Sequence, residues 1–194
     1  MTFGIWRFRQ TGVLLAPMTL TRWALALSSF VALVPCRAQD ATPPAAPADV
    51  KSQDAIMHAI YDVISGPAGP RDWNRFYSLF APGGRLIPTV HHGGDTAATV
   101  MVYTPQEYAH QADGYFNKNG FFEKELAHTV ETYGAITQDF STYGSYHTAK
   151  DAKPFARGIN SFQLFNDGKR WYVVTIYWDE ETPSTPLPQK YLHS

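Results

Sequence analysis

Residues 157–180, RGINSFQLFNDGKRWYVVTIYWDE, contain two runs of β-favouring residues on either side of Asp167-Gly168. Asp-Gly is a preferred dipeptide for the tight type I′ turn of a β-hairpin. We therefore predict two paired strands, one over residues 157–166 and one over residues 169–179.

The last of these strands has no polar face. Residues 171–178 are apolar in nearly every position, whereas a strand with one solvated face alternates. Its second face must therefore be covered, either by more of this chain or by another subunit. No predicted helix remains for that task, so we expect a homodimer that packs sheet to sheet.

Further strands precede this hairpin. Residues 122–133 and 135–146 flank Gly134 and are predicted to form a second long hairpin. Residues 85–90 form a shorter strand, and Pro88 within it favours an edge position because proline cannot donate a ladder hydrogen bond. Residues 97–103 are also predicted to be extended.

Three helices are predicted in the first part of the domain. The first lies between a cap at Asp49 or Ser52 and Gly66, with isoleucines at helical spacing. The second covers residues 73–80 and has aromatic residues at i, i+3, i+4 and i+7. The third begins with Thr104-Pro105-Gln106-Glu107, a capping box with proline at the first helical position. The order predicts an α+β domain.

The N-terminus has the features of an export signal. Residues 1–38 contain four arginines and no acidic residue, and an apolar run from Trp23 to Val34 is too short to span a membrane. Cleavage is predicted after Ala38, from a start at Met1 or Met18, which implies a periplasmic or secreted protein without a stable membrane span. A membrane anchor and a lipoprotein attached at Cys36 are the alternatives.

The whole chain then divides into four parts. After the signal peptide (residues 1–38) comes a linker rich in proline and alanine (39–49), the folded domain (50–182) and an irregular C-terminal tail (183–194). The chain has 194 residues, one cysteine and a formal net charge of -1. Removal of the signal would make it more acidic, which argues against a nucleic-acid partner.

The order of helices and strands resembles the nuclear transport factor 2-like (SnoaL-like) superfamily. The resemblance rests on residues 157–168 and 171–181, supported by residues 129–134 and 141–143, and it extends over about residues 50–192. It implies a cone-shaped, curved antiparallel sheet wrapped around three helices. More narrowly, it points to an uncharacterised exported bacterial branch.

The same resemblance implies a deep pocket between the curved sheet and the helices. Apolar pockets with a few polar groups are the usual sites for small molecules. We expect a small, largely apolar organic ligand, bound by residues of the second and third helices and of the last two strands. These candidates are Trp73, Phe76, Tyr77, Tyr115, Phe116, Arg157 and Trp178.

Four polar residues on the predicted strands are candidates for catalysis. His128 could act as a general acid or base, and Tyr143 and Asn160 could donate hydrogen bonds to a developing negative charge. Glu131 points to the face opposite His128; if buried, it would need a partner, for which Arg157 is the natural candidate. Each of the four also has a purely structural interpretation, and for Asp139, a further possible base, we favour a solvated surface position.

Metal and cofactor sites are not predicted. His91 and His92 are adjacent, so on a strand they point to opposite faces. Gly83-Gly84 and Gly93-Gly94 lack the pattern of a phosphate-binding loop.

The sequence therefore favours an exported small-molecule-binding protein. It could catalyse cofactor-free acid–base chemistry of the isomerase, dehydratase or cyclase type, and whether it is an enzyme stays open. The alternatives are a non-catalytic ligand-binding or protein-interaction module of the same fold, and a structural dimer with an accessory role.

Overall fold

The protein was analysed as a computed structural model, which describes residues 42–92 and 97–193. The predicted signal peptide and cleavage site lie outside the described residues. None of the helices in the described ranges is long and apolar enough to cross a membrane.

The described residues form helices first and long strands afterwards. In chain order the elements are α1 (Pro47–Val50), α2 (Gln53–Ile64), α3 (Trp73–Ser78), β1 (Phe80–His92), β2 (Ala97–Val100), α4 (Pro105–Phe116), β3 (Phe122–Tyr133), β4 (Ile136–Tyr146), β5 (Ala156–Asn166), β6 (Trp171–Glu180) and the 3-10 helix η1 (Gln189–Tyr191).

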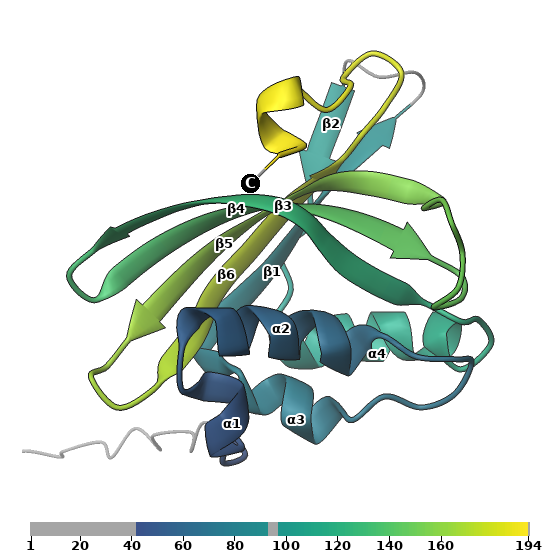
Figure 1. The fold of residues 1–194 in the computed structure, drawn as a ribbon. Coiled ribbons are helices and arrows are strands. Elements are labelled where there is room, and N and C mark those ends of the chain that lie inside the picture. The colour runs from purple at the N-terminus through teal and green to yellow at the C-terminus, as the bar shows by residue number, and fades with distance from the viewer. Residues whose placement is uncertain (1–41, 93–96, 194) are drawn as a thin grey trace, which may run out of the picture. The chain divides into compact units, whose positions relative to one another are not determined.

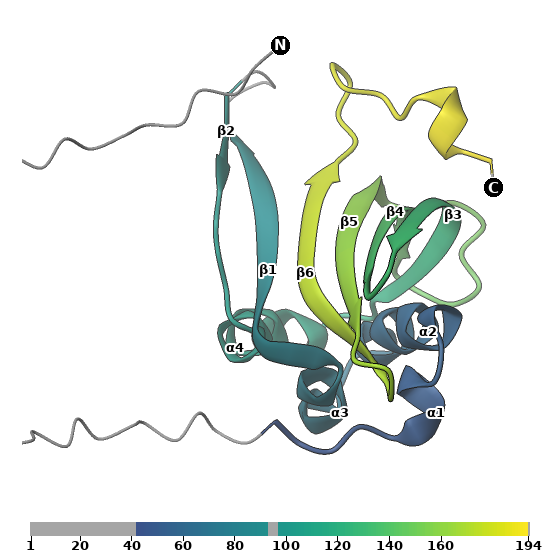
Figure 2. The ribbon, with the colours of Figure 1, turned by 90° about the vertical axis from the view of Figure 1, so that its left-hand side faces the viewer.

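The strands form one curved, six-stranded sheet in the order β2-β1-β6-β5-β4-β3. The helices lie against one face of this sheet, which we call the inner face, and the C-terminal segment lies on the opposite, outer face (Figures 1 and 2). The predicted α+β class is confirmed. The sheet is mixed rather than wholly antiparallel, because β1 runs parallel to β6.

Local sequence explains where the helices begin. The backbone N–H of Ala55 donates to the Ser52 side chain at the start of α2, and Thr104 and Glu107 form the predicted capping box of α4. α1 was not predicted, because its residues were assigned to the linker. Its single turn begins at Pro47, a residue that the first turn of a helix tolerates well.

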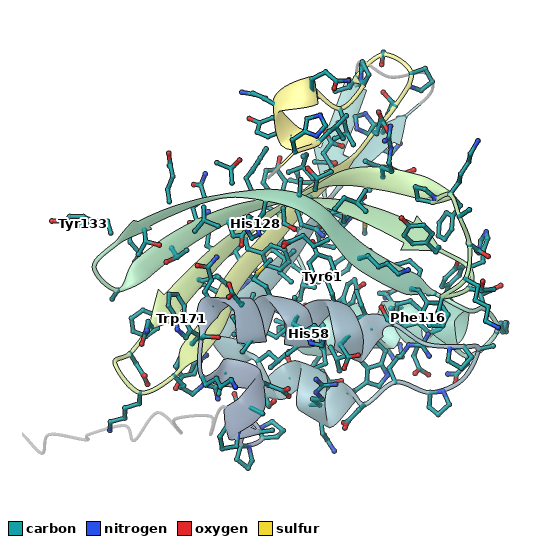
Figure 3. The ribbon with its side chains drawn as sticks, in the orientation of Figure 1. His58, Tyr61, Phe116, His128, Tyr133 and Trp171 are labelled. Carbon is teal, nitrogen blue, oxygen red and sulfur yellow. The ribbon has the colours of Figure 1, made fainter. Side chains whose placement is uncertain are left out.

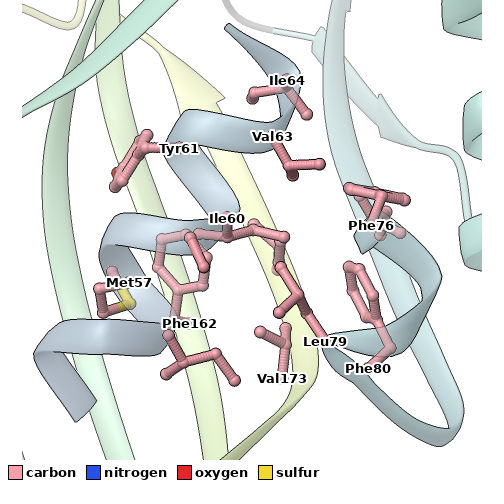
Figure 4. Close-up of a cluster of buried hydrophobic side chains, with 14 of the residues drawn as sticks. Met57, Ile60, Tyr61, Val63, Ile64, Phe76, Leu79, Phe80, Phe162 and Val173 are labelled. Carbon is pink, nitrogen blue, oxygen red and sulfur yellow. The ribbon is translucent and has the colours of Figure 1, made fainter. Parts of the chain in front are cut away.

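The core lies between α2, α3 and the inner face of the sheet. Phe162 of β5 and Val173 of β6 pack against the buried side of α2, and Leu79 and Phe80 close the end near α3 (Figure 4). All four side chains are almost fully buried. Burial of each such side chain stabilises the fold by roughly 1.5–3 kcal/mol.

Two predictions about the strands were wrong. β1 is long and lies inside the sheet, between β2 and β6, although Pro88 favoured an edge. The Pro88 carbonyl accepts a hydrogen bond from Met101, so the pairing continues around the proline through its oxygen. The predicted tight type I′ turn at Asp167-Gly168 was also wrong, because the β5–β6 connection has four residues. Within it, the Asp167 carboxylate accepts hydrogen bonds from the N–H groups of Lys169 and Arg170.

The C-terminal tail covers part of the outer face. The Thr142 hydroxyl donates to the Tyr191 carbonyl at 2.5 Å, and the Tyr191 ring lies 5.1 Å from that of Phe140. The tail was predicted to be irregular, and η1 is a single turn within it. The tail therefore covers β4, whereas Tyr177 on the outer face of β6 stays 44% exposed.

Candidate functional site

A cavity of about 210 Å³ lies between the inner face of the sheet and helices α2, α3 and α4. Its wall is mainly aromatic and aliphatic, with a few polar groups supplied by the strands. The lining residues are Ile60, Tyr61, Ile64, Phe76, Leu86, Tyr108, Phe121, Glu123, Tyr143, Ser145, Phe155, Ala156, Asn160, Phe162, Ile176, Trp178 and Glu180.

Strand register brings the polar groups of the cavity together. Glu123 on β3 pairs with Ser145 on β4, and Tyr143 pairs with Gly158 on β5, two residues before Asn160. Because alternate residues share a face, all of these side chains point inward. Gly158 is required there, since a Cβ atom would overlap the backbone carbonyl oxygen of Asp179 and the Tyr143 ring and hydroxyl.

Glu123 is the acidic residue of the cavity wall whose carboxylate is hydrogen-bonded to side chains of β4 and β5. The Asn160 amide donates to its Oε1 at 3.1 Å, and the Ser145 hydroxyl donates to its Oε2 at 3.2 Å. Burial in apolar surroundings raises the pKa of Glu123 to about 7, and the two donors oppose that rise. Glu123 can therefore gain or lose a proton near neutral pH.

Two tyrosine hydroxyls near this carboxylate are available to donate a hydrogen bond to a ligand. Within the described residues, neither Tyr108 nor Tyr143 donates a hydrogen bond from its hydroxyl. Burial and the negative charge of Glu123 raise the pKa of both. Both hydroxyls therefore stay protonated and can donate to a bound ligand.

Tyr61 separates the cavity from a second, more open cleft between α2 and β3 (Figure 3). Its hydroxyl accepts from the Asn160 amide at 3.1 Å and lies 2.7 Å from the Ser141 hydroxyl. The Ser141 proton is used toward Glu125 at 2.5 Å, so Tyr61 donates to Ser141. The chain of bonds fixes Asn160, and with it Glu123.

The sequence-predicted residues divide into two groups. Tyr143, Asn160, Phe76 and Trp178 line the cavity. The other five expected ligand-binding residues do not, namely Trp73, Tyr77, Tyr115, Phe116 and Arg157.

Four of these five residues lie in the core, in another hollow or at the surface. Trp73 donates to Asp113 and stacks on Phe116, which is itself buried in the core. Tyr77 lines a hollow outside the cavity, and Tyr115 is 43% exposed. Helix α3 ends at Ser78, so its aromatic residues pack around the short helix instead of forming one stripe toward the sheet.

The predicted Glu131–Arg157 pair was wrong. Arg157 pairs with Glu181 instead, with 2.8 Å between its Nε and the carboxylate. Glu131 is exposed and is registered opposite Gln138, whereas Arg157 is registered opposite Gly144. These two positions on β4 are roughly 20 Å apart along the strand.

His128 lies outside the cavity, at the cleft between α2 and β3. A bulge in β3 between Glu125 and Ala127 shifts the strand register by one residue. As a result Glu125 and His128, three residues apart, meet on the inner face, with 2.8 Å between Glu125 Oε1 and His128 Nδ1. Simple alternation along β3 could not reveal this contact.

Glu123 was not predicted as a site residue, and Asp139 was expected at a solvated position. The alternation of Phe122, Glu123, Lys124 and Glu125 offered a signal, because it puts two acids on one face of a strand. The expected solvated position of Asp139 was wrong, since its side chain is 0% exposed. Its burial comes from α2, which covers this part of β4.

Helix order, strand order and the cavity between them define an α+β protein whose curved sheet is covered by helices on one face, the arrangement that the resemblance to the nuclear transport factor 2-like superfamily implies. No family model and no curated protein matches the sequence.

Solved structures with similar folds exist. One is a protein of unknown function with a cystatin-like fold from Nostoc punctiforme, 11% identical, with a TM-score of 0.49 over 69% of this chain and 90% of that chain. An NTF2-like protein of unknown function from Shewanella baltica is 14% identical, with a TM-score of 0.38 over 68% and 98% of the two chains. A protein from Kribbella flavida, proposed to be a ketosteroid isomerase, is 15% identical, with a TM-score of 0.38 over 75% and 89%. Each likeness concerns the fold alone.

Proposed function

We propose that this protein binds a small, largely apolar organic molecule in the cavity and moves a proton on it without a cofactor. The observation that carries the proposal is the position of Glu123. Its carboxylate lies in the wall of an apolar cavity, beside the free hydroxyls of Tyr108 and Tyr143.

The size and lining of the cavity support a small substrate with one polar group. Its volume of about 210 Å³ is below the roughly 300–1,000 Å³ of sites for drug-sized ligands. Phe76, Phe162 and Trp178 would hold the apolar part. A carbonyl-like oxygen would then face the tyrosine hydroxyls.

The chemistry follows from the two kinds of group. Ionised Glu123 takes a proton from the carbon next to the carbonyl, and the negative charge moves to the oxygen. A hydrogen bond from Tyr143 stabilises this oxygen in the low-dielectric cavity. Protonated Glu123 then returns the proton to the same or to a neighbouring atom, which exchanges hydrogen or isomerises the substrate.

The experiment uses acetophenone, cyclohexanone and 2-indanone as probes. Their exchange of α-hydrogen for deuterium in ²H₂O is followed by NMR, with binding measured by saturation transfer in the same samples. We expect exchange above the buffer rate for the probe that binds, reduced about 100-fold or more in Glu123→Gln and about 100-fold in Tyr143→Phe.

Glu180→Gln is the matched control, because Glu180 also lines the cavity but makes no hydrogen bond to Asn160 or Ser145. It should keep the exchange rate. Equal exchange in wild type and Glu123→Gln, or no exchange with any probe, would overturn the catalytic proposal.

A non-catalytic binding protein is the second candidate. It is favoured by the fact that both oxygens of Glu123 already accept hydrogen bonds from Asn160 and Ser145. Binding of a probe without exchange, unchanged in Glu123→Gln, would support this candidate.

We also propose that the protein is exported and forms a homodimer through the outer face of the sheet. Residues 1–38 support export, which cell fractionation tests. Ile136, Phe165 and Tyr177, on the outer face, are 63%, 37% and 44% exposed. Light scattering at micromolar concentration should give the mass of a dimer, and Tyr177→Glu should give that of a monomer.

A further inference from the structure

The cleft between α2 and β3 is a second hollow on the inner face of the sheet. Its volume is about 450 Å³, and its lining is more polar in residue type than that of the cavity. Among the acidic residues and histidines that line it, Glu125, His128 and Asp139 lie close enough together to hold one metal ion.

Strand pairing brings these three side chains together. His128 on β3 is registered opposite Ser141 on β4, two residues from Asp139. The bulge before Ala127 adds Glu125 to the same face. One ligand atom from each of the three lies within 4.8 Å of the other two. His128 Nδ1 is 2.8 Å from Glu125 Oε1 and 4.0 Å from Asp139 Oδ2.

One carboxylate oxygen of Asp139 has no hydrogen-bond donor among the described residues. Its side chain is 0% exposed; one carboxylate oxygen, Oδ2, accepts from Gln53 at 3.0 Å. The other oxygen, Oδ1, is buried and has no hydrogen-bond partner among the described residues. A buried carboxylate oxygen without a donor is unfavourable, so a hydrogen-bond donor or a cation beside it would stabilise it.

The charges around Asp139 also favour a bound cation. Glu125 and Asp54 place negative charge near it, and His128 is a neighbouring imidazole. Negative groups thus outnumber the positive group that faces this carboxylate.

We propose that Glu125, His128 and Asp139 bind a divalent first-row transition-metal cation, for which Zn²⁺ is the probe. One imidazole nitrogen and two carboxylate oxygens suit Zn²⁺, whereas Mg²⁺ and Ca²⁺ prefer oxygen ligands alone. Three protein ligands leave a further coordination position open to the cleft, which a water molecule would fill.

Neighbouring side chains hold the proposed ligands in place. Ser141 donates to Glu125 Oε2 at 2.5 Å, and Gln53 donates to Asp139 Oδ2. These bonds leave Glu125 Oε1 and His128 Nδ1 for the ion, together with the carboxylate of Asp139, whose Oδ2 lies 4.0 Å from His128 Nδ1. Because metal ligands bind in their deprotonated forms, binding should weaken as the pH falls.

The test is calorimetric titration of the untagged protein with ZnCl₂, with Co²⁺ absorption as a second readout. We expect one ion per chain. Asp139→Asn and His128→Gln should weaken binding by at least 100-fold, and Gln53→Ala by about 10- to 100-fold. The matched control is Glu131→Gln, on the same strand but exposed, which should bind as wild type does.

Several outcomes would overturn the proposal. They are an absence of Zn²⁺ binding, equal binding by wild type and Asp139→Asn, and displacement of Zn²⁺ by equimolar Ca²⁺ or Mg²⁺. His128→Gln alters a side chain that is 39% exposed, so it decides the question if Asp139→Asn fails to fold. The test does not depend on the proposed function, because Tyr143→Phe, at a residue that lines the cavity and not the cleft, should bind Zn²⁺ as wild type does.

Discussion

The cavity and the cleft lie on the same face of the sheet, and each holds a buried carboxylate, but the two carboxylates are satisfied differently. Glu123 accepts a hydrogen bond on each of its oxygens. Asp139 accepts one bond, and its second oxygen has no partner in the described residues. Burial raises the pKa of both.

The difference suggests different uses for similar groups. A carboxylate with a donor on each oxygen is held in one orientation, and the aromatic wall beside it leaves room for an apolar substrate. A carboxylate that lies beside a histidine and a second acid, and whose second oxygen has no hydrogen-bond donor, is in surroundings typical of a cation ligand. Neighbouring hydrogen-bond donors, rather than burial alone, separate a proton carrier from a ligand.

The largest expected effect comes from Tyr61, which both hollows share. Tyr61→Ala should lower the free energy of unfolding by about 3–5 kcal/mol, because a buried aromatic ring is lost and a void joins cavity and cleft. The ring packs against Phe162, with 6.0 Å between the centroids. Chemical denaturation measures the loss.

Tyr61→Phe separates packing from hydrogen bonding. It keeps the ring but removes the hydroxyl between Asn160 and Ser141, at an expected cost of about 1–3 kcal/mol. If both variants lose the same stability, packing does not explain the effect of the alanine variant.

The pH dependence of stability should distinguish Glu123 from the exposed acids. Its pKa is about 7 in the folded protein against an ordinary 4.5, so the folded state holds the proton more tightly than the unfolded state does. Stability from this group is present below pH 4.5 and is lost as the pH rises toward 7. The loss is on the order of 3 kcal/mol.

The measurement compares wild type with Glu123→Gln by denaturation at several pH values between 4.5 and 7.5. The variant should lose this part of the decline, since glutamine does not titrate. Glu131→Gln serves as the control and should decline as wild type does. Parallel curves for wild type and Glu123→Gln would show that the cavity does not perturb this carboxylate.

A smaller effect is expected from the donors. Ser145→Ala removes one of the two hydrogen bonds to Glu123, and Gln53→Ala removes the one bond that Asp139 accepts from the described residues. Each should cost about 1–3 kcal/mol at pH 7.5, where both acids are largely ionised. Added Zn²⁺ should restore part of the stability of Gln53→Ala and none of that of Ser145→Ala, as thermal unfolding would show.

The sequence was sufficient for most of the architecture. The hairpins around Gly134 and Asp167-Gly168 and the Thr104 capping box are local signals, and the structure contains each of these elements. β1 was misplaced because its position depends on long-range parallel pairing with β6. The sequence near Pro88 carries no trace of that partner.

The site was less accessible to prediction. Tyr143 and Asn160 were predicted as hydrogen-bond donors because they lie on predicted strands, and both line the cavity. The contact between Glu125 and His128 was missed because a bulge between them shifts the register of β3. The burial of Asp139 depends on a helix more than seventy residues earlier, with Gln53 as its contact.

The smallest effect is expected at Arg157, which the sequence placed at the ligand and the structure places outside the cavity. Its ion pair with Glu181 is partly exposed, with side-chain exposures of 37% and 21%, and such pairs contribute about 0–1 kcal/mol. Arg157→Ala should therefore change the free energy of unfolding by no more than that and leave probe binding in the cavity unchanged. Denaturation and saturation-transfer NMR provide the two measurements. A loss of binding with unchanged stability would return Arg157 to the ligand site and would mean that the cavity reaches further along β5 than its lining indicates.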